Sequence, residues 1–184
     1  MPILQTGFQV VSRTAQHGLI ESSKADTAKE KWFYVWCGDI AGELGEVMKL
    51  RASPSFSNKD EDSKEFLTEI GDVLWGVCAL AMLNGLDADS VRFYPVTEGI
   101  MNPLTFDQCL LDALELLDYG KKICRDGIAE RPIDVAFVQQ KLALIYNYLR
   151  VNYDTEIAIE LVDTKLLKRY PNGFNAKDSV NRVV

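Results

Sequence analysis

Apolar residues recur along this chain at spacings of three and four, which is the period of an amphipathic α-helix. The clearest stripe consists of Trp32, Val35, Trp36, Ile40, Leu44, Val47 and Leu50. This helix is expected to end near Arg51, because Pro54 disfavours helical geometry in the residue that precedes it. The polar and charged residues 53–63 then predict a loop.

A second apolar stripe predicts another helix directly after this loop. Its members are Phe66, Ile70, Val73, Leu74, Val77, Leu80, Ala81 and Leu83. Asp62 and Glu65 have the spacing of a capping box and are expected to begin the helix, and the Asn-Gly pair after Leu83 is expected to end it. Residues 85–103 are expected to be irregular, apart from a short turn after Asp87.

Three further helices are predicted in the second half of the chain, the first of them opened by a capping box of Thr105 and Gln108. They are expected to run from Thr105 to Gly127, from Asp134 to Val151 and from Asp154 to just before Pro171. Near the N-terminus we expect a helix over 8–15 and a loop over 17–29. No segment shows the alternation of a strand, so the predicted fold class is all-α, and 184 residues fit one domain.

A weak internal repeat relates two parts of the predicted bundle. The pattern Ala41-x-Glu43-Leu44-x-Glu46-x-x-Lys49 recurs 72 residues later as Ala113-x-Glu115-Leu116-x-Asp118-x-x-Lys121. Any two amphipathic helical hairpins can be aligned this well, so a duplication and a simple insertion both stay open. The single domain 1–184 is accordingly divided into a helical hairpin at 30–92, an inserted or degenerate second hairpin at 104–151, and a terminal helix with the segment after it at 154–175.

The charge balance narrows the classes of function. The formal net charge of −7 argues against non-specific binding to nucleic acid or to an anionic membrane, so we expect neither among the partners. Apolar residues make up 47% and charged residues 26%, which is ordinary for a soluble globular protein. An acidic protein can still bind a polyphosphate where a metal ion and a few cationic side chains reverse the sign locally.

The cysteines and the longest apolar run bear on the compartment. Cys37, Cys78, Cys109 and Cys124 lie far apart without a C-x-x-C motif, which predicts reduced and mostly buried thiols. The apolar run Val73–Leu83 is too short for the roughly 20 residues that span a bilayer. The N-terminus lacks the basic start and apolar run of a signal peptide. We therefore expect a cytoplasmic protein.

Two short acidic motifs carry the candidate chemistry. Glu43 and Glu46 form E-x-x-E, and Glu69 and Asp72 form E-x-x-D. Residues three apart lie on one face of a helix, so each motif aims two carboxylates in one direction. If the two helices pack antiparallel, all four carboxylates converge, with Glu65 one turn away as a fifth or outer partner.

Converging carboxylates repel one another and are costly to bury, so a cation is needed to offset the charge. Oxygen ligands without histidine or thiolate favour Mg²⁺, with Mn²⁺ as the alternative. The competing interpretation is a solvated helix face, which is what most E-x-x-E pairs are. Gly42 and Gly45 favour a functional site, because each costs the helix roughly 1 kcal/mol and indicates that something approaches closely.

The segments "AGELGEV" (41–47), "EIGDVLWGVCALAMLNGLD" (69–87) and "KLLKRYPNGF" (165–174) resemble the MazG-like family of all-α nucleoside triphosphate pyrophosphohydrolases. That family is marked by E-x-x-E, a gap of variable length and E-x-x-D, and the gap here is residues 47–68. The resemblance covers roughly 30–90 and 155–175. It implies a MazG-like helical bundle and a metal site of Glu43, Glu46, Glu69 and Asp72.

The resemblance also implies that Lys165 and Arg169, with Lys168 as a third cation, face the nucleotide phosphates. For Lys168 and Arg169, compensation of the helix dipole is an equally weighted alternative. The chain departs from many members at Val162, where they have asparagine, which places the sugar or phosphate contact in doubt. Trp75 is a candidate to stack on the base, as are two tryptophans of the first stripe, although a core role is expected more often for all three.

The implied reaction is Mg²⁺-dependent hydrolysis of a nucleoside triphosphate to the monophosphate and pyrophosphate. Glu43 and Glu46 are the candidate catalytic residues, with Glu43 preferred as the general base. A carboxylate-bridged di-iron bundle is disfavoured because the sequence has no E-x-x-H. The alternative from another class is a catalytically inactive helical module that binds a nucleotide or regulates. We further expect a homodimer, since one pair of helical hairpins buries little surface.

Overall fold

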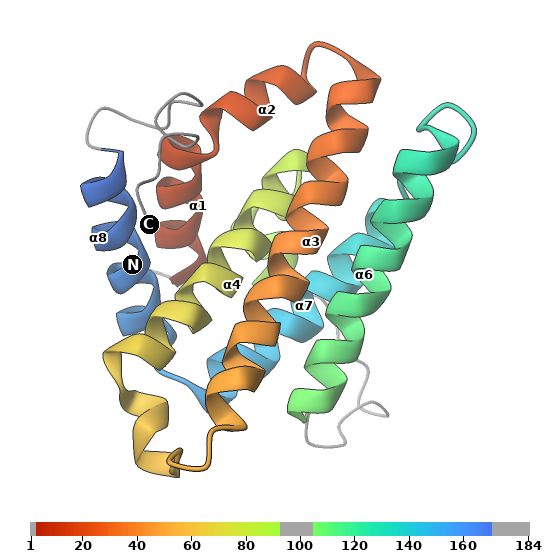
Figure 1. Ribbon diagram of the computed structural model, residues 1–184. Helices are drawn as coiled ribbons and strands as arrows, with labels where there is room; N and C mark the ends of the chain where they lie inside the picture. The colour runs from red at the N-terminus through yellow and green to blue at the C-terminus, as the bar shows by residue number, and fades with distance from the viewer. Residues whose placement is uncertain (1–2, 93–104, 171–184) are drawn as a thin grey trace.

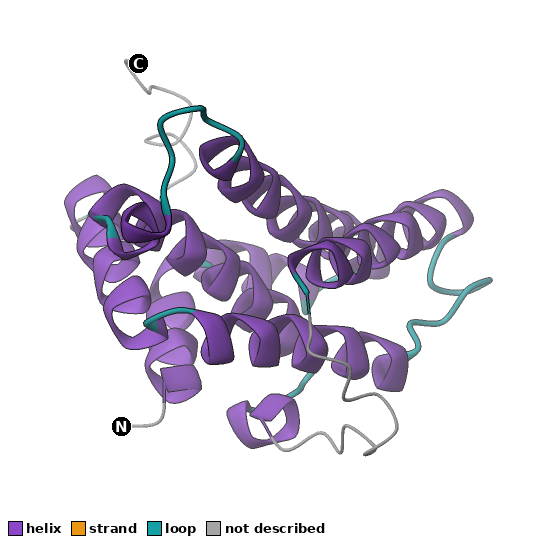
Figure 2. Ribbon diagram, turned by 90° about the horizontal axis from the view of Figure 1, so that it is seen from below, coloured by secondary structure: helices purple, strands orange, loops and turns teal. Residues whose placement is uncertain are grey.

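The structure is a computed structural model that describes residues 3–92 and 105–170. Every regular element in these two ranges is a helix, and neither range contains a strand (Figure 2). The prediction of an all-α fold is therefore confirmed. The irregular segment predicted after α5 and the "PNGF" part of the last motif lie outside the described residues.

The helices in chain order are α1 (Ile3–Thr14), α2 (Gln16–Ser22), α3 (Asp26–Arg51), the short 3₁₀ helix η1 (Asn58–Asp62), α4 (Lys64–Leu83), α5 (Ala88–Arg92), α6 (Phe106–Asp126), α7 (Val135–Asn152) and α8 (Thr155–Arg169). α3 and α4 form an antiparallel hairpin at the centre of the molecule (Figure 1). α1 and α8 lie on one side of this hairpin, and α6 lies on the other with α7 behind it.

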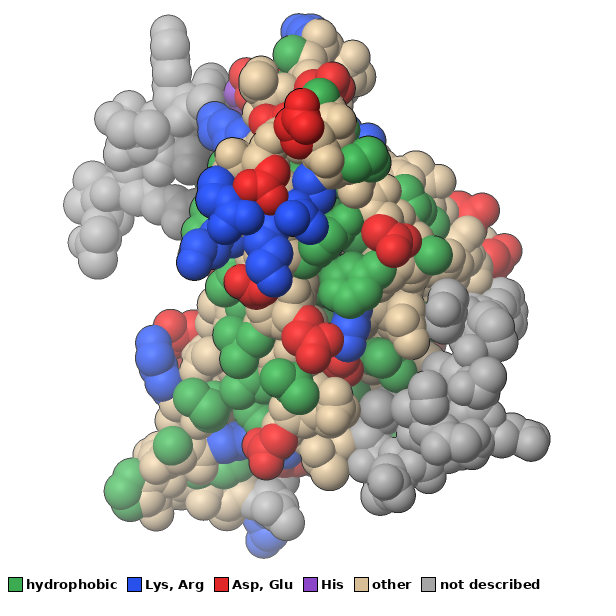
Figure 3. All heavy atoms as spheres, turned by 90° about the vertical axis from the view of Figure 1, so that its right-hand side faces the viewer, with side chains coloured by type: hydrophobic (Ala, Val, Ile, Leu, Met, Phe, Trp, Pro, Cys, Tyr) green, Lys and Arg blue, Asp and Glu red, His purple; other side chains and the backbone are tan. Residues whose placement is uncertain are grey.

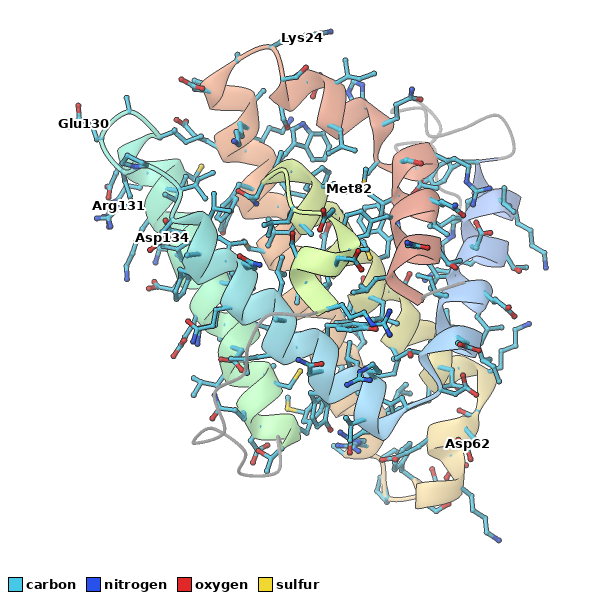
Figure 4. All side chains as sticks on the ribbon, turned by 180° about the vertical axis from the view of Figure 1, so that it is seen from behind. Lys24, Asp62, Met82, Glu130, Arg131 and Asp134 are labelled. Atoms are coloured by element: carbon cyan, nitrogen blue, oxygen red, sulfur yellow. The ribbon has the colours of Figure 1, made fainter. Side chains whose placement is uncertain are left out.

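The packing partners explain why α4 is so apolar. This helix packs against α3, α8, α1 and α7, whereas α3 packs mainly against α4, α6 and α2. Its residues Ile70, Val77 and Leu80 are fully buried, as are Phe33 and Leu44 on α3. Seen from behind, the α6–α7 connection with Glu130, Arg131 and Asp134 lies far from α1 and α8 (Figure 4).

By length and composition α4 as a whole, at 20 residues, passes as a candidate membrane span, unlike the shorter run considered from the sequence. In the protein, however, 72% of its most apolar window is buried. Burial against four neighbouring helices accounts for its apolar character without a membrane. It is the one helix in the described part of the chain that meets these criteria.

Near the N-terminus the helix expected over 8–15 already begins at Ile3, whereas from Arg51 onward the helix ends agree with the sequence-based expectations except at the start of α4. There the N-cap is Ser63, whose hydroxyl accepts a hydrogen bond from the amide of Phe66 at 3.2 Å. The predicted capping box of Asp62 and Glu65 is therefore wrong, because Asp62 still belongs to η1 and the N-cap lies one residue later, at Ser63. At the other end Gly85 has φ +70°, a left-handed conformation that favours glycine just after a helix.

At Thr105 one half of the predicted capping box is observed, since its hydroxyl accepts a hydrogen bond from the amide of Gln108. Asp134 and Asp154, where the next two helices are expected to begin, cap α7 and α8 through their side chains. The short turn expected after Asp87 is α5. These side chains satisfy amides that have no partner within the helix, so the element boundaries are decided locally.

The N-terminal region differs from the expectation of a loop over 17–29. Residues 16–22 form α2, and α3 already begins at Asp26. α2 has no side-chain N-cap, and its Gly18 packs directly on Trp32 and Trp36. A side chain at this glycine would place its Cβ 2.9 Å from the Trp32 ring. Contact with α3, rather than local propensity, accounts for this short helix.

The second hairpin, α6 with α7, holds its acidic residues in a different way from the first. Asp112 is 1% exposed, and its Oδ1 lies 2.7 Å from Lys141 Nζ, which also pairs with Glu115. Asp118 pairs with Lys122 at 2.5 Å. The chain therefore supplies its own cations here. Whether the hairpin is an insertion or a degenerate repeat stays a prediction.

The surface on the α6 side carries hydrophobic side chains among charged ones (Figure 3). Leu111 and Leu114 are about half exposed, at 48% and 47%. The expected homodimer stays a prediction. Of the four thiols, Cys37, Cys78 and Cys109 are buried as expected and Cys124 is exposed, and all four are free.

Candidate metal centre and adjoining pocket

Three of the four predicted metal ligands meet in the structure. Glu43 on α3 and Glu69 and Asp72 on α4 each offer one carboxylate oxygen, and these oxygens lie within 4.8 Å of one another. The group arises because α3 and α4 run antiparallel and each motif repeats with the helical period. All three side chains are half-buried. We call Glu43, Glu69 and Asp72 the acidic triad.

The fourth predicted ligand, Glu46, lies outside the triad. It is exposed, and its carboxylate pairs with Lys49 at 2.5 Å one turn along the same helix. Its negative charge still reaches Glu69 and contributes to raising the pKa of that group. Glu65 is also exposed and does not join the triad. A role for Glu46 as a ligand stays a prediction that requires its side chain to leave Lys49.

The triad disfavours its own ionisation. Burial raises the pKa of Glu43 to about 7, and the charges of Asp72 and Glu69 add to this shift. Burial also raises the pKa of Glu69, with the charge of Asp72 as the next cause. Carboxyl groups in this condition gain from a nearby cation, which restores the charged form. The donor set of three oxygens fits a hard divalent cation such as Mg²⁺ or Mn²⁺.

A cationic side chain already touches this group. Lys165 on α8 forms an ion pair with Asp72, and the two side chains are only 25% and 14% exposed. The amine thereby offsets part of the negative charge and lowers the pKa of Glu43 and Glu69. Gly71 makes the pairing possible, because it lets α8 approach α4 at Ala158 and Val162.

A pocket of about 320 Å³ opens beside the triad. Its walls come from the α1–α2 junction, α3, α4 and the end of α8, and they consist of Thr14, Ala15, Gly18, Trp32, Trp36, Asp39, Glu43, Asp72, Trp75, Lys165, Leu166, Arg169 and Tyr170. The pocket thus has acidic, basic and aromatic parts. Segments far apart in sequence supply them, so only the packing of five helices, α1, α2, α3, α4 and α8, brings them together.

The tryptophans of this pocket are held in place by polar contacts at their edges. The indole nitrogen of Trp75 donates to Thr14 Oγ1 at 2.8 Å, and that of Trp32 donates to Glu21 Oε2 at 3.0 Å. Trp32 and Trp36 lie against each other with ring centroids 5.5 Å apart. Trp36 is 2% exposed and belongs to the core, which is the preferred expectation for the tryptophans. All three tryptophans nevertheless line the pocket.

Of the three cationic residues predicted to contact phosphate, two line the pocket and one does not. Lys165 and Arg169 line the pocket, whereas Lys168 is exposed and lies outside its lining. Val162, the departure from the MazG-like pattern, packs against Gly71. The neighbouring Asp163 pairs with Arg13 of α1 at 2.5 Å. Val162 and Asp163 thus hold α8 against α4 and α1.

Sequence reasoning missed Asp39, which lies within the pocket lining. It follows Trp32 and Trp36 and precedes Glu43 at spacings of seven, three and four residues, so it shares their helix face. This spacing could have identified Asp39 from the sequence as a residue of the same site. Its carboxyl group is half-buried, and burial raises its pKa to about 6.

The close approach expected at Gly42 and Gly45 does not come from the described part of the protein itself. A Cβ added at either residue meets no atom within 4 Å among the described residues. The close approach occurs instead at Gly71, where a Cβ would lie 2.3 Å from the carbonyl oxygen of Ala158. The small residue that matters is therefore in the second acidic motif.

The raised pKa values predict how metal-free stability depends on pH. A carboxyl group whose pKa is raised by folding contributes stability below its unfolded pKa, and this contribution is lost as pH rises through the folded pKa. Between pH 5 and 8, in EDTA, Glu43→Gln should therefore lose less stability than the wild type. We expect its Tm at pH 8 to be higher by roughly 2–4 °C, because solvent screening limits the gain to about 1 kcal/mol.

Mg²⁺ should raise the Tm of the wild type at pH 8 and raise that of Glu43→Gln less. Thermal unfolding monitored by circular dichroism measures both effects. Glu160→Gln, at an exposed position of α8, is the control and should keep the wild-type pH dependence. The same slope in Glu43→Gln as in the wild type would contradict the pKa shift.

No protein-family model matches the chain, and comparisons with curated proteins and with solved structures found no match either.

Proposed function

We propose that this protein is a divalent-cation-dependent nucleoside triphosphate pyrophosphohydrolase, which releases a nucleoside monophosphate and pyrophosphate. The observation that carries the proposal is the acidic triad at the edge of a 320 Å³ pocket with tryptophan walls. A hard cation on the carboxylates suits a polyphosphate, and the indole rings suit a nucleobase.

The triad would hold Mg²⁺, or Mn²⁺, through Glu43, Glu69 and Asp72. Bound there, the ion neutralises phosphate charge and lowers the pKa of a coordinated water. Lys165, which contacts Asp72 of the triad, and Arg169, which lines the same pocket, bring two positive charges to the site. These cations offset the negative charge that a triphosphate brings into an acidic site.

Glu43 is the preferred general base. Its carboxylate belongs to the triad and also lines the pocket, where it can reach a water beside the α-phosphate. In the proposed step a water oxygen bonds to the α-phosphorus while the bond from that phosphorus to the bridging oxygen breaks. The water proton passes to Glu43, and the bridging oxygen leaves with pyrophosphate. Lys165 and Arg169 counter the charge that develops on the leaving group.

A second candidate function follows from the ion pair between Lys165 and Asp72. In this alternative the amine permanently takes the place of a cation, and the protein is an inactive module that binds a nucleotide or regulates. It predicts nucleotide binding that does not depend on a divalent cation. The proposed enzyme instead requires Lys165 to turn from Asp72 toward the phosphates when the cation arrives.

The test is a pyrophosphate-release assay against canonical and modified NTPs and dNTPs, with Mg²⁺, Mn²⁺ or EDTA. We expect release that needs the cation and that differs among the bases. Titration calorimetry with Mg²⁺ alone and with nucleotide alone runs beside it. Nucleotide binding that is the same in EDTA, with no release from any substrate, would favour the inactive module and contradict the enzyme.

A further inference from the structure

Asp39 is the one carboxylate of the pocket outside the triad, and no hydrogen bond or ion pair reaches it from the described residues. The other two carboxylates of the lining belong to the triad, and one of them pairs with Lys165. A half-buried carboxylate without a partner loses hydration and gains nothing in return. An acceptor in this condition suits a ligand that brings its own donor.

The position of Asp39 along α3 places it between the triad and the aromatic wall. At 1.5 Å rise per residue, Asp39 lies about 6 Å along the axis from Glu43, and Trp36 lies about 10 Å from it. Across the pocket Trp75 follows Asp72 by three residues, and Gly76 beside it packs on Ile40. On these antiparallel helices Asp39 and Trp75 therefore lie within two residues, about 3 Å along the axis, of the same level.

A nucleotide has the same order of parts. Its sugar lies between the α-phosphate and the base, so a nucleotide with its phosphates at the triad and its base at Trp32 and Trp36 presents its sugar at the level of Asp39. The sugar carries hydroxyl groups that donate hydrogen bonds, and an ionised carboxylate only accepts them. Carboxylates bind sugar hydroxyls in the same way in dinucleotide-binding folds.

We propose that Asp39 is a specificity-determining residue whose carboxylate accepts a hydrogen bond from a hydroxyl of the nucleotide sugar, taken as the 3′-hydroxyl because ribonucleotides and 2′-deoxyribonucleotides share it. This inference rests on the proposed function, because it uses the placement of the phosphates at the triad. It adds a determinant of the sugar, which neither acidic motif contains.

The experiment is a double-mutant cycle in which one change is made in the protein and the other in the nucleotide. Values of kcat/KM are measured for the preferred nucleotide and for its 3′-deoxy counterpart, with the wild type and with Asp39→Ala. In the wild type we expect loss of the 3′-hydroxyl to lower kcat/KM by about 10- to 100-fold, the usual effect of a hydrogen bond to a charged group. In Asp39→Ala the two nucleotides should differ by no more than about 2-fold.

Asp118→Asn is the matched control, since it removes one carboxylate from a helix surface outside this pocket. It should keep the wild-type discrimination. Tm values confirm that each variant is folded. A structural role of Asp39 would lower kcat/KM equally for both nucleotides, and this outcome would overturn the inference while leaving the proposed function intact.

If the wild type binds nucleotides without releasing pyrophosphate, the same cycle is measured as Kd by calorimetry in the presence of Mg²⁺. Coupling between Asp39 and the 3′-hydroxyl in these Kd values would support the sugar contact, while the absence of pyrophosphate release would refute the enzymatic step alone; equal Kd ratios in both proteins would overturn the sugar contact. Failure to bind any nucleotide would overturn both proposals.

Discussion

Replacement of Glu69 by Gln together with Asp72 by Asn is expected to lower kcat/KM for pyrophosphate release by at least about 10³-fold. Two of the three converging carboxylates are then replaced by uncharged amide groups, so the triad loses most of its attraction for a divalent cation. Loss of a single well-placed electrostatic group already costs on the order of 10²–10³ in rate. Pyrophosphate release at saturating Mg²⁺ measures the effect.

The fold of this double variant should survive. It removes two mutually repelling carboxylates but also the partner of the Lys165 amine, so in EDTA its Tm is expected to stay close to that of the wild type. The matched control is the double variant Asp118→Asn, Glu160→Gln, which removes the same charge from positions outside the pocket. Activity retained within about 10-fold in the triad variant would show that the chemistry takes place elsewhere.

Gly71→Ala is expected to lower the free energy of unfolding by about 3 kcal/mol or more, with a fall in Tm of roughly 10 °C. The added Cβ would lie 2.3 Å from the carbonyl oxygen of Ala158 and 2.6 Å from a methyl carbon of Val162. A backbone carbonyl cannot rotate away as the tip of a flexible side chain can. α8 must then move from α4, and Lys165 moves with it. Denaturant unfolding measures the loss.

Gly42→Ala and Gly45→Ala provide the contrast within the same site. Both glycines lie inside α3 with no atom within 4 Å of an added Cβ, so each change should stabilise the protein by about 0.5–1 kcal/mol through helix propensity alone. If Gly71→Ala proved as harmless as these two, the close packing of α8 on α4 would be contradicted.

The N-terminal region illustrates where sequence reasoning about the fold stops. The stripes that begin at Trp32 and Phe66 are long and regular, and their helices end where Pro54 and Gly85 require. α2 has no such signal, because seven residues with an internal glycine are too short to be a stable helix alone. It is helical because Gly18 packs on the tryptophans of α3.

The sequence by itself determined the all-α class, most helix boundaries, and the pairing of acidic residues on two helix faces. These features depend on the helical period and on capping side chains, which act within a few residues. The tertiary structure alone decided that Glu43, Glu69 and Asp72 converge while Glu46 turns to Lys49. It also decided that a pocket forms beside them, because its walls come from five helices whose contacts no local pattern encodes.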